Sequence, residues 1–232
     1  MRFLIESFNA CESVLTWDNL TVDLTALSLT KTWIGTVNYN KSLRFEHLRR
    51  LVIDKCQTFG GGGGDIRNYF TPEHMPRLTH LALKLSQNFA PAESFVRTPI
   101  FAEIKTFALS FDADTNKISV VLNELQNAKK LEHLSIFVMP QEQSILFNHP
   151  FPVSLKSLHI NYLLFYDYDH VNYDVLDWLD ELMEKKNGKS RVEKIVLHAS
   201  RRPLERERPG WNPTAVEWRR KGMTPFADFG GK

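Results

Sequence analysis

Apolar residues recur along this chain in the spacing apolar-x-x-apolar-x-apolar, and the residues between them change from one copy to the next. The stretches LRRLVI (48–53), LTHLAL (78–83) and LEHLSI (131–136) show the pattern most clearly. A fixed spacing with changing filler residues indicates one structural unit used several times. The spacing occurs in seven units: Leu24-Leu27-Leu29, Leu48-Leu51-Ile53, Leu78-Leu81-Leu83, Ile104-Phe107-Leu109, Leu131-Leu134-Ile136, Leu155-Leu158-Ile160 and Val192-Ile195-Leu197.

The spacing of each unit predicts a short β-strand. Positions are numbered here from the first apolar residue of the unit, so the other two apolar residues occupy positions 4 and 6. Alternate side chains of a strand point to opposite faces, so positions 4 and 6 share one face and positions 3 and 5 share the other. One such strand cannot bury its apolar face alone, but stacked copies form a parallel sheet with a continuous apolar layer.

The intervals between the units leave room for the crossovers that parallel strands require. The units begin 24, 30, 26, 27, 24 and 37 residues apart. Residues 116–130 have apolar side chains at helical spacing, and residues 171–188 combine an apolar stripe, early acidic residues, two final lysines and Gly188 as a stop. The second helix falls in the 37-residue interval and accounts for its length. The pattern therefore predicts an α/β solenoid with a short-stranded parallel sheet and irregular helices on its convex side.

The stretch LRRLVIDKCQTF resembles a leucine-rich repeat of the cysteine-containing type, with Cys56 at the family's Asn/Cys position and Phe59 as the next apolar residue. The resemblance covers roughly residues 20–200. Irregular repeats of this length are most similar to the C-terminal repeats of F-box proteins, particularly fungal ones. The resemblance implies a horseshoe arc of about seven units that holds a substrate for a cullin-type ubiquitin ligase. No F-box is visible, because residues 1–23 form too short a segment and contain no proline.

The pattern divides the chain into three parts. Residues 1–23 are expected to form an N-terminal cap or a diverged first repeat, and residues 24–200 the leucine-rich repeats. Residues 201–232 contain four prolines, which do not fit a further repeat. We expect this Pro/Arg-rich tail either to cover the open end of the stack, with its aromatic residues, or to form a disordered basic arm.

The composition adds limits to this picture. The chain of 232 residues is 43% hydrophobic and 24% charged, which is typical of a soluble globular protein, and it has no apolar run long enough to cross a membrane. Two cysteines favour a reducing compartment, the cytoplasm or the nucleus. The net charge of the whole chain is +2. Residues 201–232 carry eight Lys/Arg and four Asp/Glu, so the basic excess belongs to the tail. This excess is too small to predict nucleic-acid binding.

Motifs that would indicate catalysis, a cofactor or a metal are weak. The stretch TFGGGGGDIRN (58–68) lacks the Lys and Ser/Thr of a phosphate loop, which favours a flexible connector. The acidic stretch YDYDHVNYD (166–174) presents Asn172 and Trp178 where a calcium loop requires Gly and Glu, so its acids are expected to open the following helix. The eight histidines form no HExxH motif. We therefore expect no enzyme activity, no cofactor and no metal.

Positions 3 and 5 of leucine-rich repeats line the concave face, and the resemblance implies that a partner binds there. In this chain both positions are mostly small or polar, as a solvated sheet face should be. The two positions after each unit contribute five apolar residues, which form either an exposed strip along one edge of this face or part of the core: Leu85, Phe111, Phe137, Val138 and Tyr162. The expected partner-binding residues are Arg50, His80, Leu85, Phe111, His133, Phe137, Val138, His159 and Tyr162.

The predicted function is a non-catalytic protein–protein interaction module that binds a partner on its concave face. The resemblance implies substrate recognition in an F-box-type ubiquitin ligase, with cullin-type ligase subunits as further partners. The alternative is a structural or regulatory leucine-rich-repeat scaffold without a ubiquitin role. Neither interpretation includes nucleic acid or a membrane as a partner.

Overall fold

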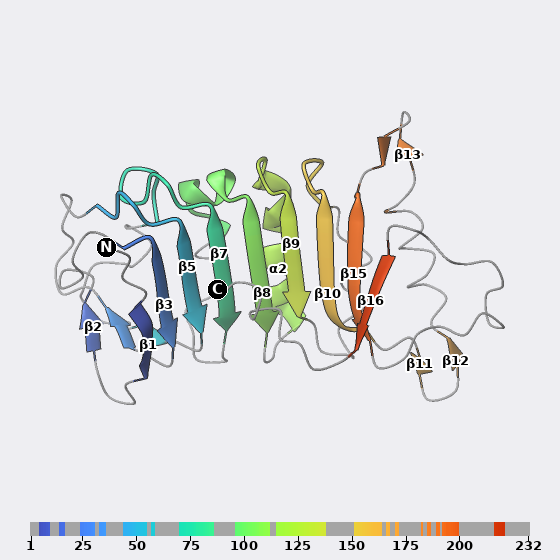
Figure 1. Ribbon diagram of the computed structural model, residues 1–232, viewed down its shortest axis with the longest axis horizontal. Helices are drawn as coiled ribbons and strands as arrows, with labels where there is room; N and C mark the ends of the chain where they lie inside the picture. The colour runs from blue at the N-terminus through green and yellow to red at the C-terminus, as the bar shows by residue number, and fades with distance from the viewer. Residues whose placement is uncertain are drawn as a thin grey trace.

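The computed structural model is organised around one nine-stranded sheet in which every neighbouring pair is parallel (Figure 1). Chain order and spatial order agree, so each strand lies beside the preceding strand of the sheet. The prediction of an α/β chain with a parallel sheet in a solenoid-like arrangement is confirmed. The strands are β1 (Ile5–Asn9), β3 (Ala26–Thr30), β5 (Arg50–Asp54), β7 (His80–Leu85), β8 (Thr106–Phe111), β9 (His133–Phe137), β10 (Ser157–Leu163), β15 (Lys194–Ala199) and β16 (Val216–Arg220).

The structure describes just over half of the chain, including all of these strands. The described residues are 5–9, 14–16, 24–30, 33–35, 44–54, 57–58, 70–85, 96–111, 115–137, 151–163, 166–167, 170–171, 182, 185–186, 189–190, 192–199 and 216–220.

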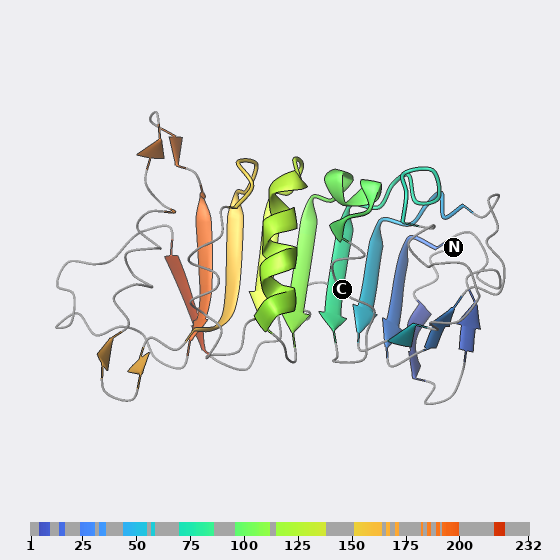
Figure 2. The same ribbon diagram turned by 180° about the vertical axis from the view of Figure 1, so that it is seen from behind.

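Smaller elements surround the sheet. A second, three-stranded parallel sheet consists of β2 (Val14–Thr16), β4 (Trp33–Gly35) and β6 (Gln57–Thr58). Two antiparallel pairs are β11 (Tyr166–Asp167) with β12 (His170–Val171), and β13 (Lys185–Lys186) with β14 (Lys189–Ser190). The helical elements are η3 (Pro99–Glu103), α2 (Thr115–Glu124) and η4 (Leu125–Asn127). Helix α2 lies on the face of the large sheet that is turned toward the viewer in Figure 2.

The apolar triplets of the seven units form the core. Each member whose side chain is described is buried, and none is more than 5% exposed. Helix α2 and η4 add Val121, Leu122 and Leu125, which are also fully buried. This agrees with the apolar layer that the spacing predicts behind the strands.

A fourth buried position lies three residues before five of the seven units, and the predicted pattern does not include it. The backbone N–H of position 1 donates a hydrogen bond of 3.1 to 3.3 Å to the carbonyl oxygen of this residue, which closes a turn at the entry to the strand. The signal was present in the sequence, because apolar residues occupy the position in five consecutive units. These residues are Phe45, Met75, Phe101, Ala128 and Pro152.

A second repeated contact joins each unit to the next. The carbonyl oxygen at position 2 accepts hydrogen bonds from the N–H groups at positions 2 and 3 of the following unit, at 2.8 to 3.3 Å. The contact therefore sets the alignment of neighbouring units at the point where their strands begin. It occurs at six successive carbonyls, those of Thr25, Arg49, Thr79, Lys105, Glu132 and Lys156.

The two predicted helices have different outcomes. Helix α2 with η4 confirms the prediction over residues 116–130. The prediction over residues 171–188 is wrong at its described ends, because Val171 belongs to β12 and Lys185–Lys186 to β13. Between these ends only Leu182 is among the described residues, and it is helical and buried, as predicted. The dipeptide Asn-Gly separates β13 from β14, and this dipeptide favours the two-residue connection of a hairpin rather than a helix stop.

Both ends of the predicted array carry an additional strand. Strand β1, from the segment 1–23, pairs with β3, and β16, from the segment 201–232, pairs with β15. Trp218 is the register partner of Leu197, so this part of the tail continues the sheet and occupies the edge of β15. Of the glycine-rich stretch 58–68, only Thr58 is among the described residues.

We expect Phe107→Ala to lower the free energy of unfolding by about 3–5 kcal/mol, the usual cost of deleting a buried aromatic ring. Phe107 is fully buried, and its ring meets that of Phe101 edge-on, with centroids 5.0 Å apart. The control is Thr106→Ala, at the next residue but on the opposite side of β8, with an expected change below about 1 kcal/mol. Urea unfolding followed by circular dichroism measures both, and equal losses would contradict the assignment of the two sides.

Candidate partner-binding face

The side of the large sheet that faces away from the core presents three rows of residues, one residue from each of the seven units. We call this side the open face, and no described helix covers it in Figure 1. Row 3, at position 3 of the units, consists of Ala26, Arg50, His80, Thr106, His133, Ser157 and Lys194. Row 5 consists of Ser28, Val52, Ala82, Ala108, Ser135, His159 and Val196. Row 7 continues the same alternation with Thr30, Asp54, Lys84, Ser110, Phe137, Asn161 and His198.

Row 3 is the accessible row. Arg50, His133 and Lys194 are exposed, and the other members of the row are partly exposed. The row lies where the strands begin, next to the repeated backbone contact at position 2. Since every member is aligned by backbone pairing with its neighbours, the side chains form a continuous line across the strands.

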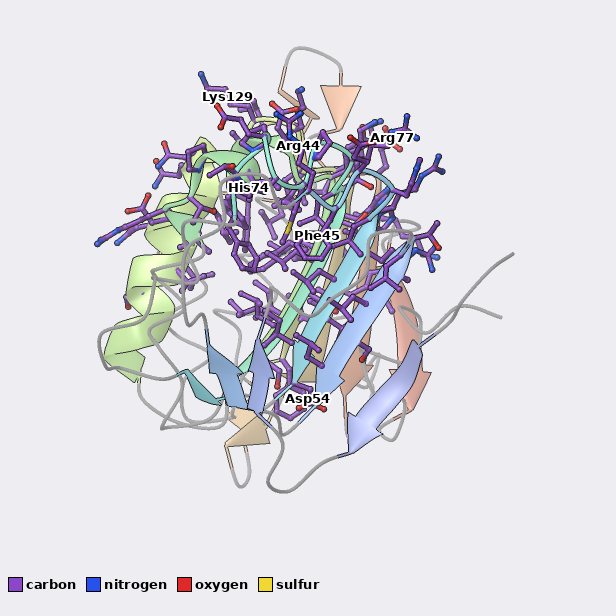
Figure 3. The ribbon with its side chains drawn as sticks, turned by 90° about the vertical axis from the view of Figure 1, so that its left-hand side faces the viewer. Arg44, Phe45, Asp54, His74, Arg77 and Lys129 are labelled. Carbon is purple, nitrogen blue, oxygen red and sulfur yellow. The ribbon has the colours of Figure 1, made fainter. Side chains whose placement is uncertain are left out.

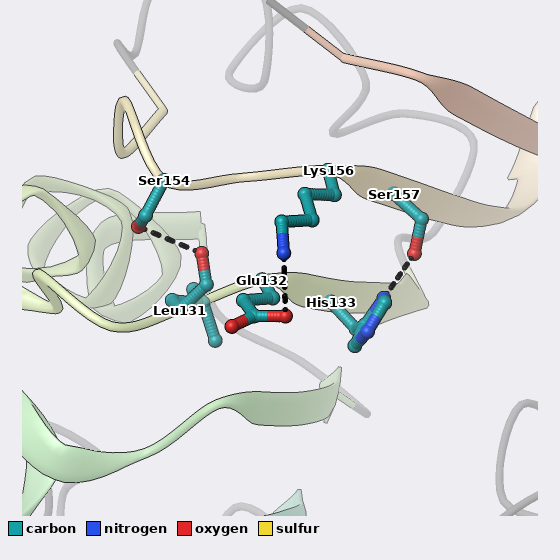
Figure 4. A network of polar contacts seen from close by, with 6 residues as sticks. All are labelled: Leu131, Glu132, His133, Ser154, Lys156 and Ser157. Carbon is teal, nitrogen blue, oxygen red and sulfur yellow. Dashed lines mark hydrogen bonds and ion pairs between the residues drawn. The ribbon is translucent and has the colours of Figure 1, made fainter.

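Polar side chains link β9 to β10 along this line (Figure 4). The His133 imidazole, through Nδ1, and the Ser157 hydroxyl share a hydrogen bond of 2.8 Å in row 3. One position earlier, Lys156 Nζ donates to Glu132 Oε2 at 3.0 Å. Before the strands begin, Ser154 Oγ donates to the carbonyl oxygen of Leu131 at 2.8 Å. These contacts use side chains of two neighbouring units, so they stabilise the packing of one unit on the next.

Four members of row 5 differ from the solvated row that the sequence predicts, whereas Ser28, Val52 and His159 are partly exposed. Ala82, Ala108 and Val196 are fully buried, and Ser135 is 6% exposed. The side chains of alanine and serine are shorter than those of the arginine, histidine and phenylalanine that flank them in rows 3 and 7. They therefore contribute little to the surface of the sheet.

Ser135 carries an unsatisfied hydroxyl. Its Oγ is buried and has no hydrogen-bond partner in the described structure. Its register partners in row 5 are Ala108, which has no polar side-chain atom, and His159. A buried polar atom without a partner costs stability, because it has given up its hydrogen bonds to water.

The expected partner-binding residues do not all lie on the open face. Arg50, His80 and His133 are in row 3 and His159 is in row 5, while Phe137 is partly exposed in row 7. These five residues therefore share one face, as the sequence predicts.

The expected apolar strip does not form one row. Leu85 and Phe111 are register partners at the ends of β7 and β8, two residues after the core positions Leu83 and Leu109. Phe137 is instead the partner of Ser110. Leu85 and Phe111 occupy position 8 of their units, which continues the alternation of positions 4 and 6. Phe137 occupies position 7 and belongs to the other alternating set. The strip as first defined is therefore wrong, because it combines residues from two alternating sets.

The other two members of the expected strip, Tyr162 and Val138, have different outcomes. Tyr162 lies in β10 between Asn161, which pairs with His198, and Leu163, which pairs with Ala199. It is the extra residue of a β-bulge, so it has no register partner on β15. Val138 lies outside the described residues.

Burial and nearby charges affect the pKa of His80, a member of row 3. Burial lowers the pKa of His80 from its ordinary value of 6.5, and the positive charges of Arg50, His133 and Lys105 lower it further. A contact with the backbone of Arg49 acts in the opposite direction. Nδ1 of His80 and Oγ1 of Thr79 are 2.8 Å apart. His80 is thus a neutral, hydrogen-bonded side chain near several cations.

His74 is a structural histidine rather than part of the open face. It is 3% exposed, and its Nδ1 lies 2.9 Å from Thr71 Oγ1. Its carbonyl oxygen accepts a 2.7 Å hydrogen bond from the N–H of Phe45, which joins the entry turns of two units. Figure 3 shows both side chains below Arg44, Arg77 and Lys129, which lie at the end of the molecule where the strands begin.

Among the described residues, no group of three or more His, Cys, Asp or Glu side chains is arranged to hold a metal ion. No helix in the same part of the chain is both long and apolar enough to cross a membrane.

Comparison of the chain with protein-family models, with curated proteins and with solved structures finds no match. The class of repeat and the function therefore have to be argued from the repeat pattern and from the open face.

Removing the unsatisfied hydroxyl should stabilise the protein. We expect Ser135→Ala to raise the free energy of unfolding by about 1 kcal/mol, because an unpaired buried hydroxyl costs roughly that much or more. The matched control is Ser157→Ala, which removes a hydroxyl bonded to His133 and should lower the free energy by up to about 1 kcal/mol. Chemical denaturation measures both variants, and a Ser135→Ala variant less stable than Ser157→Ala would contradict the assignment.

Acid should destabilise the protein through His74. Burial lowers the pKa of His74 below 6.5, so the unfolded chain binds a proton at this residue more readily than the folded chain. The stabilisation is complete above pH 6.5 and is lost as the pH falls from there toward the folded pKa, by at most about 1.4 kcal/mol per pH unit. His74→Gln should weaken this pH dependence in unfolding experiments between neutral and mildly acidic pH. The control His47→Gln changes an exposed histidine of the preceding unit and should retain the pH dependence of unfolding.

Proposed function

We propose that this chain is a leucine-rich-repeat protein that binds a protein partner on its open face and has no catalytic role. Row 3 carries the proposal, since it aligns polar and charged side chains across the strands on a face without a described helix. Aligned, accessible side chains on a rigid sheet lose little conformational freedom on binding, which favours recognition of a partner. The open face corresponds to the concave side on which such repeats bind their partners.

A narrower form of the proposal makes the chain the substrate-recognition part of an F-box-type ubiquitin ligase, acting in the cytoplasm or the nucleus. Its support is the similarity of the irregular repeats of 24 to 30 residues to those of F-box proteins. Cullin-type ligase subunits would then be partners in addition to the substrate.

The alternative is a structural or regulatory scaffold without a ubiquitin role. The polar contacts between β9 and β10 favour it, because His133, Ser157, Glu132 and Lys156 already bind one another within the chain. Side chains used in this way stabilise the stack and are less available to a partner.

The contact between His133 and Ser157 also has the residue types of a catalytic base and nucleophile. Such a pair requires a third group that orients the histidine and donors that stabilise an oxyanion. The described contacts of His133 include no hydrogen bond to a carboxylate, and its side chain is exposed on the sheet. This supports a binding role for row 3.

Replacing His133 with tryptophan should block the open face without unfolding the chain. His133 is exposed near the middle of row 3, and tryptophan is favoured in strands. We expect the amount of partner that copurifies with the tagged protein from its native cells, measured by mass spectrometry, to fall about tenfold through loss of central contacts. The control is Val153→Trp, at a residue 92% exposed in the turn before β10, and it should retain the partner.

The identity of the copurified proteins separates the two forms of the proposal. Cullin-type subunits together with a substrate would support the ligase interpretation. A stable partner without these subunits would favour a scaffold. Undiminished recovery with His133→Trp would place the interface elsewhere and contradict binding on the open face.

A further inference from the structure

Charge is unevenly distributed along the strand-entry side of the open face. In the units of β5, β7 and β8, positions 2 and 3 carry three cations and no carboxylate: Arg49, Arg50, Thr79, His80, Lys105 and Thr106. In the units of β9, β10 and β15 the same positions carry two lysines and two glutamates: Glu132, His133, Lys156, Ser157, Glu193 and Lys194. The permanent positive charge is therefore concentrated over one half of the sheet.

Arg49, Arg50, Lys105 and the intervening His80 form what we call the cationic patch. The two arginines and the lysine are exposed, and their side chains form no ion pair with any other described residue. The effect of Arg50 and Lys105 on the pKa of His80 places both charges near its imidazole. The patch thus presents three cations without a direct ion pair to a described residue, around a histidine whose lowered pKa favours its neutral form.

Glu132 marks the end of the cationic patch. A hydrogen bond from Lys156 is the main reason why the pKa of Glu132 is lowered, and the charge of Lys105 acts in the same direction. Beyond this point, Lys156 binds Glu132 directly, and Lys194 follows Glu193 in its own unit. The contrast shows that the fold accommodates acids in these positions and that the patch lacks them.

The size of the patch matches a short extended peptide. From β5 to β8 it spans two strand spacings, or about 10 Å. Alternate side chains of an extended peptide are about 7 Å apart, so two or three acidic residues at alternate positions reach across it. Arginine binds carboxylates through two parallel hydrogen bonds, which adds geometric selectivity to the attraction between charges.

We propose that the cationic patch binds an acidic, extended segment of the protein partner, which crosses β5, β7 and β8 with carboxylates at alternate positions. This inference rests on the proposed function, because it assigns a partner chemistry to one part of the same face. The remainder of row 3, over β9 to β15, contacts a part of the partner that is not predominantly acidic.

An acidic peptide fits this charge distribution better than a nucleic acid does. Nucleic acids carry phosphates at regular intervals along their whole length. A strand that continued from the patch along row 3 would bring its phosphates toward Glu132 and Glu193, which repel them. A peptide can confine its acidic residues to the patch.

The test uses the full chain and a fluorescent peptide in which Glu alternates with Ser. The patch variant is Arg49→Gln/Arg50→Gln/Lys105→Gln, and its matched control is Arg44→Gln/Arg77→Gln/Lys129→Gln, which removes the same charge from exposed residues of the entry turns. We expect the patch variant to bind the peptide about tenfold more weakly and the control within about twofold of the native chain, in line with modest contributions from exposed ion pairs. Binding should also weaken with added salt. Thermal unfolding of both variants verifies that they remain folded.

Bound carboxylates favour protonated histidine, so the pKa of His80, followed by NMR, should rise in the complex. Equal binding by the patch variant and the native chain, equal losses in both variants, or tighter binding of a single-stranded RNA than of the peptide would overturn the inference.

The partner captured by the native chain distinguishes failure of this inference from failure of the proposed function. If His133→Trp loses the partner and the patch variant keeps it, the open face binds a partner without an acidic segment. If both variants keep it, the proposed function fails as well.

Discussion

The repeated hydrogen bonds at position 2 are the constraint on which the rest of the structure depends. One carbonyl oxygen receives the N–H groups of positions 2 and 3 of the next unit, and the same geometry recurs from Thr25 to Lys156. This contact starts each strand pair from β3 to β15 at the same position of the unit, whatever the length of the preceding crossover. Intervals that vary from 24 to 37 residues therefore still produce strands in register.

The register between neighbouring strands determines which residues share a side of the sheet. Because equal positions of successive units become neighbours, the apolar positions 4 and 6 combine into a continuous core, and position 3 becomes a continuous line on the other side. The core constrains its positions to buried apolar residues, whereas row 3 accepts arginine, histidine, threonine, serine or lysine. The side chains available for binding are thus free to vary while the backbone that aligns them stays the same.

The sequence predicts the parts of this structure that depend on strong periodicity. The seven strands and the helix near residues 116–130 follow from apolar spacing alone, since burial on one side leaves few alternatives. Features that depend on single residues were harder to predict. The Asn-Gly dipeptide after Lys186 fits a helix stop as well as a hairpin connection, and only the pairing of β13 with β14 decides between them. The burial of Ala82, Ala108 and Ser135 in row 5 does not follow from polarity, because it depends on the small size of these side chains.

Without a partner, the cationic patch holds like charges close together. Like charges close together repel one another, and they add to the effect of burial, which is the main cause of the lowered pKa of His80. The neighbouring units show how the same positions are neutralised, since Glu132 binds Lys156 directly. A glutamate at position 2 or 3 near Arg49 or Arg50 would relieve the repulsion without disturbing the core, because these positions lie outside it. The absence of such a residue from the described patch has no explanation in the packing of the fold, and it is accounted for when the compensating carboxylates belong to another protein.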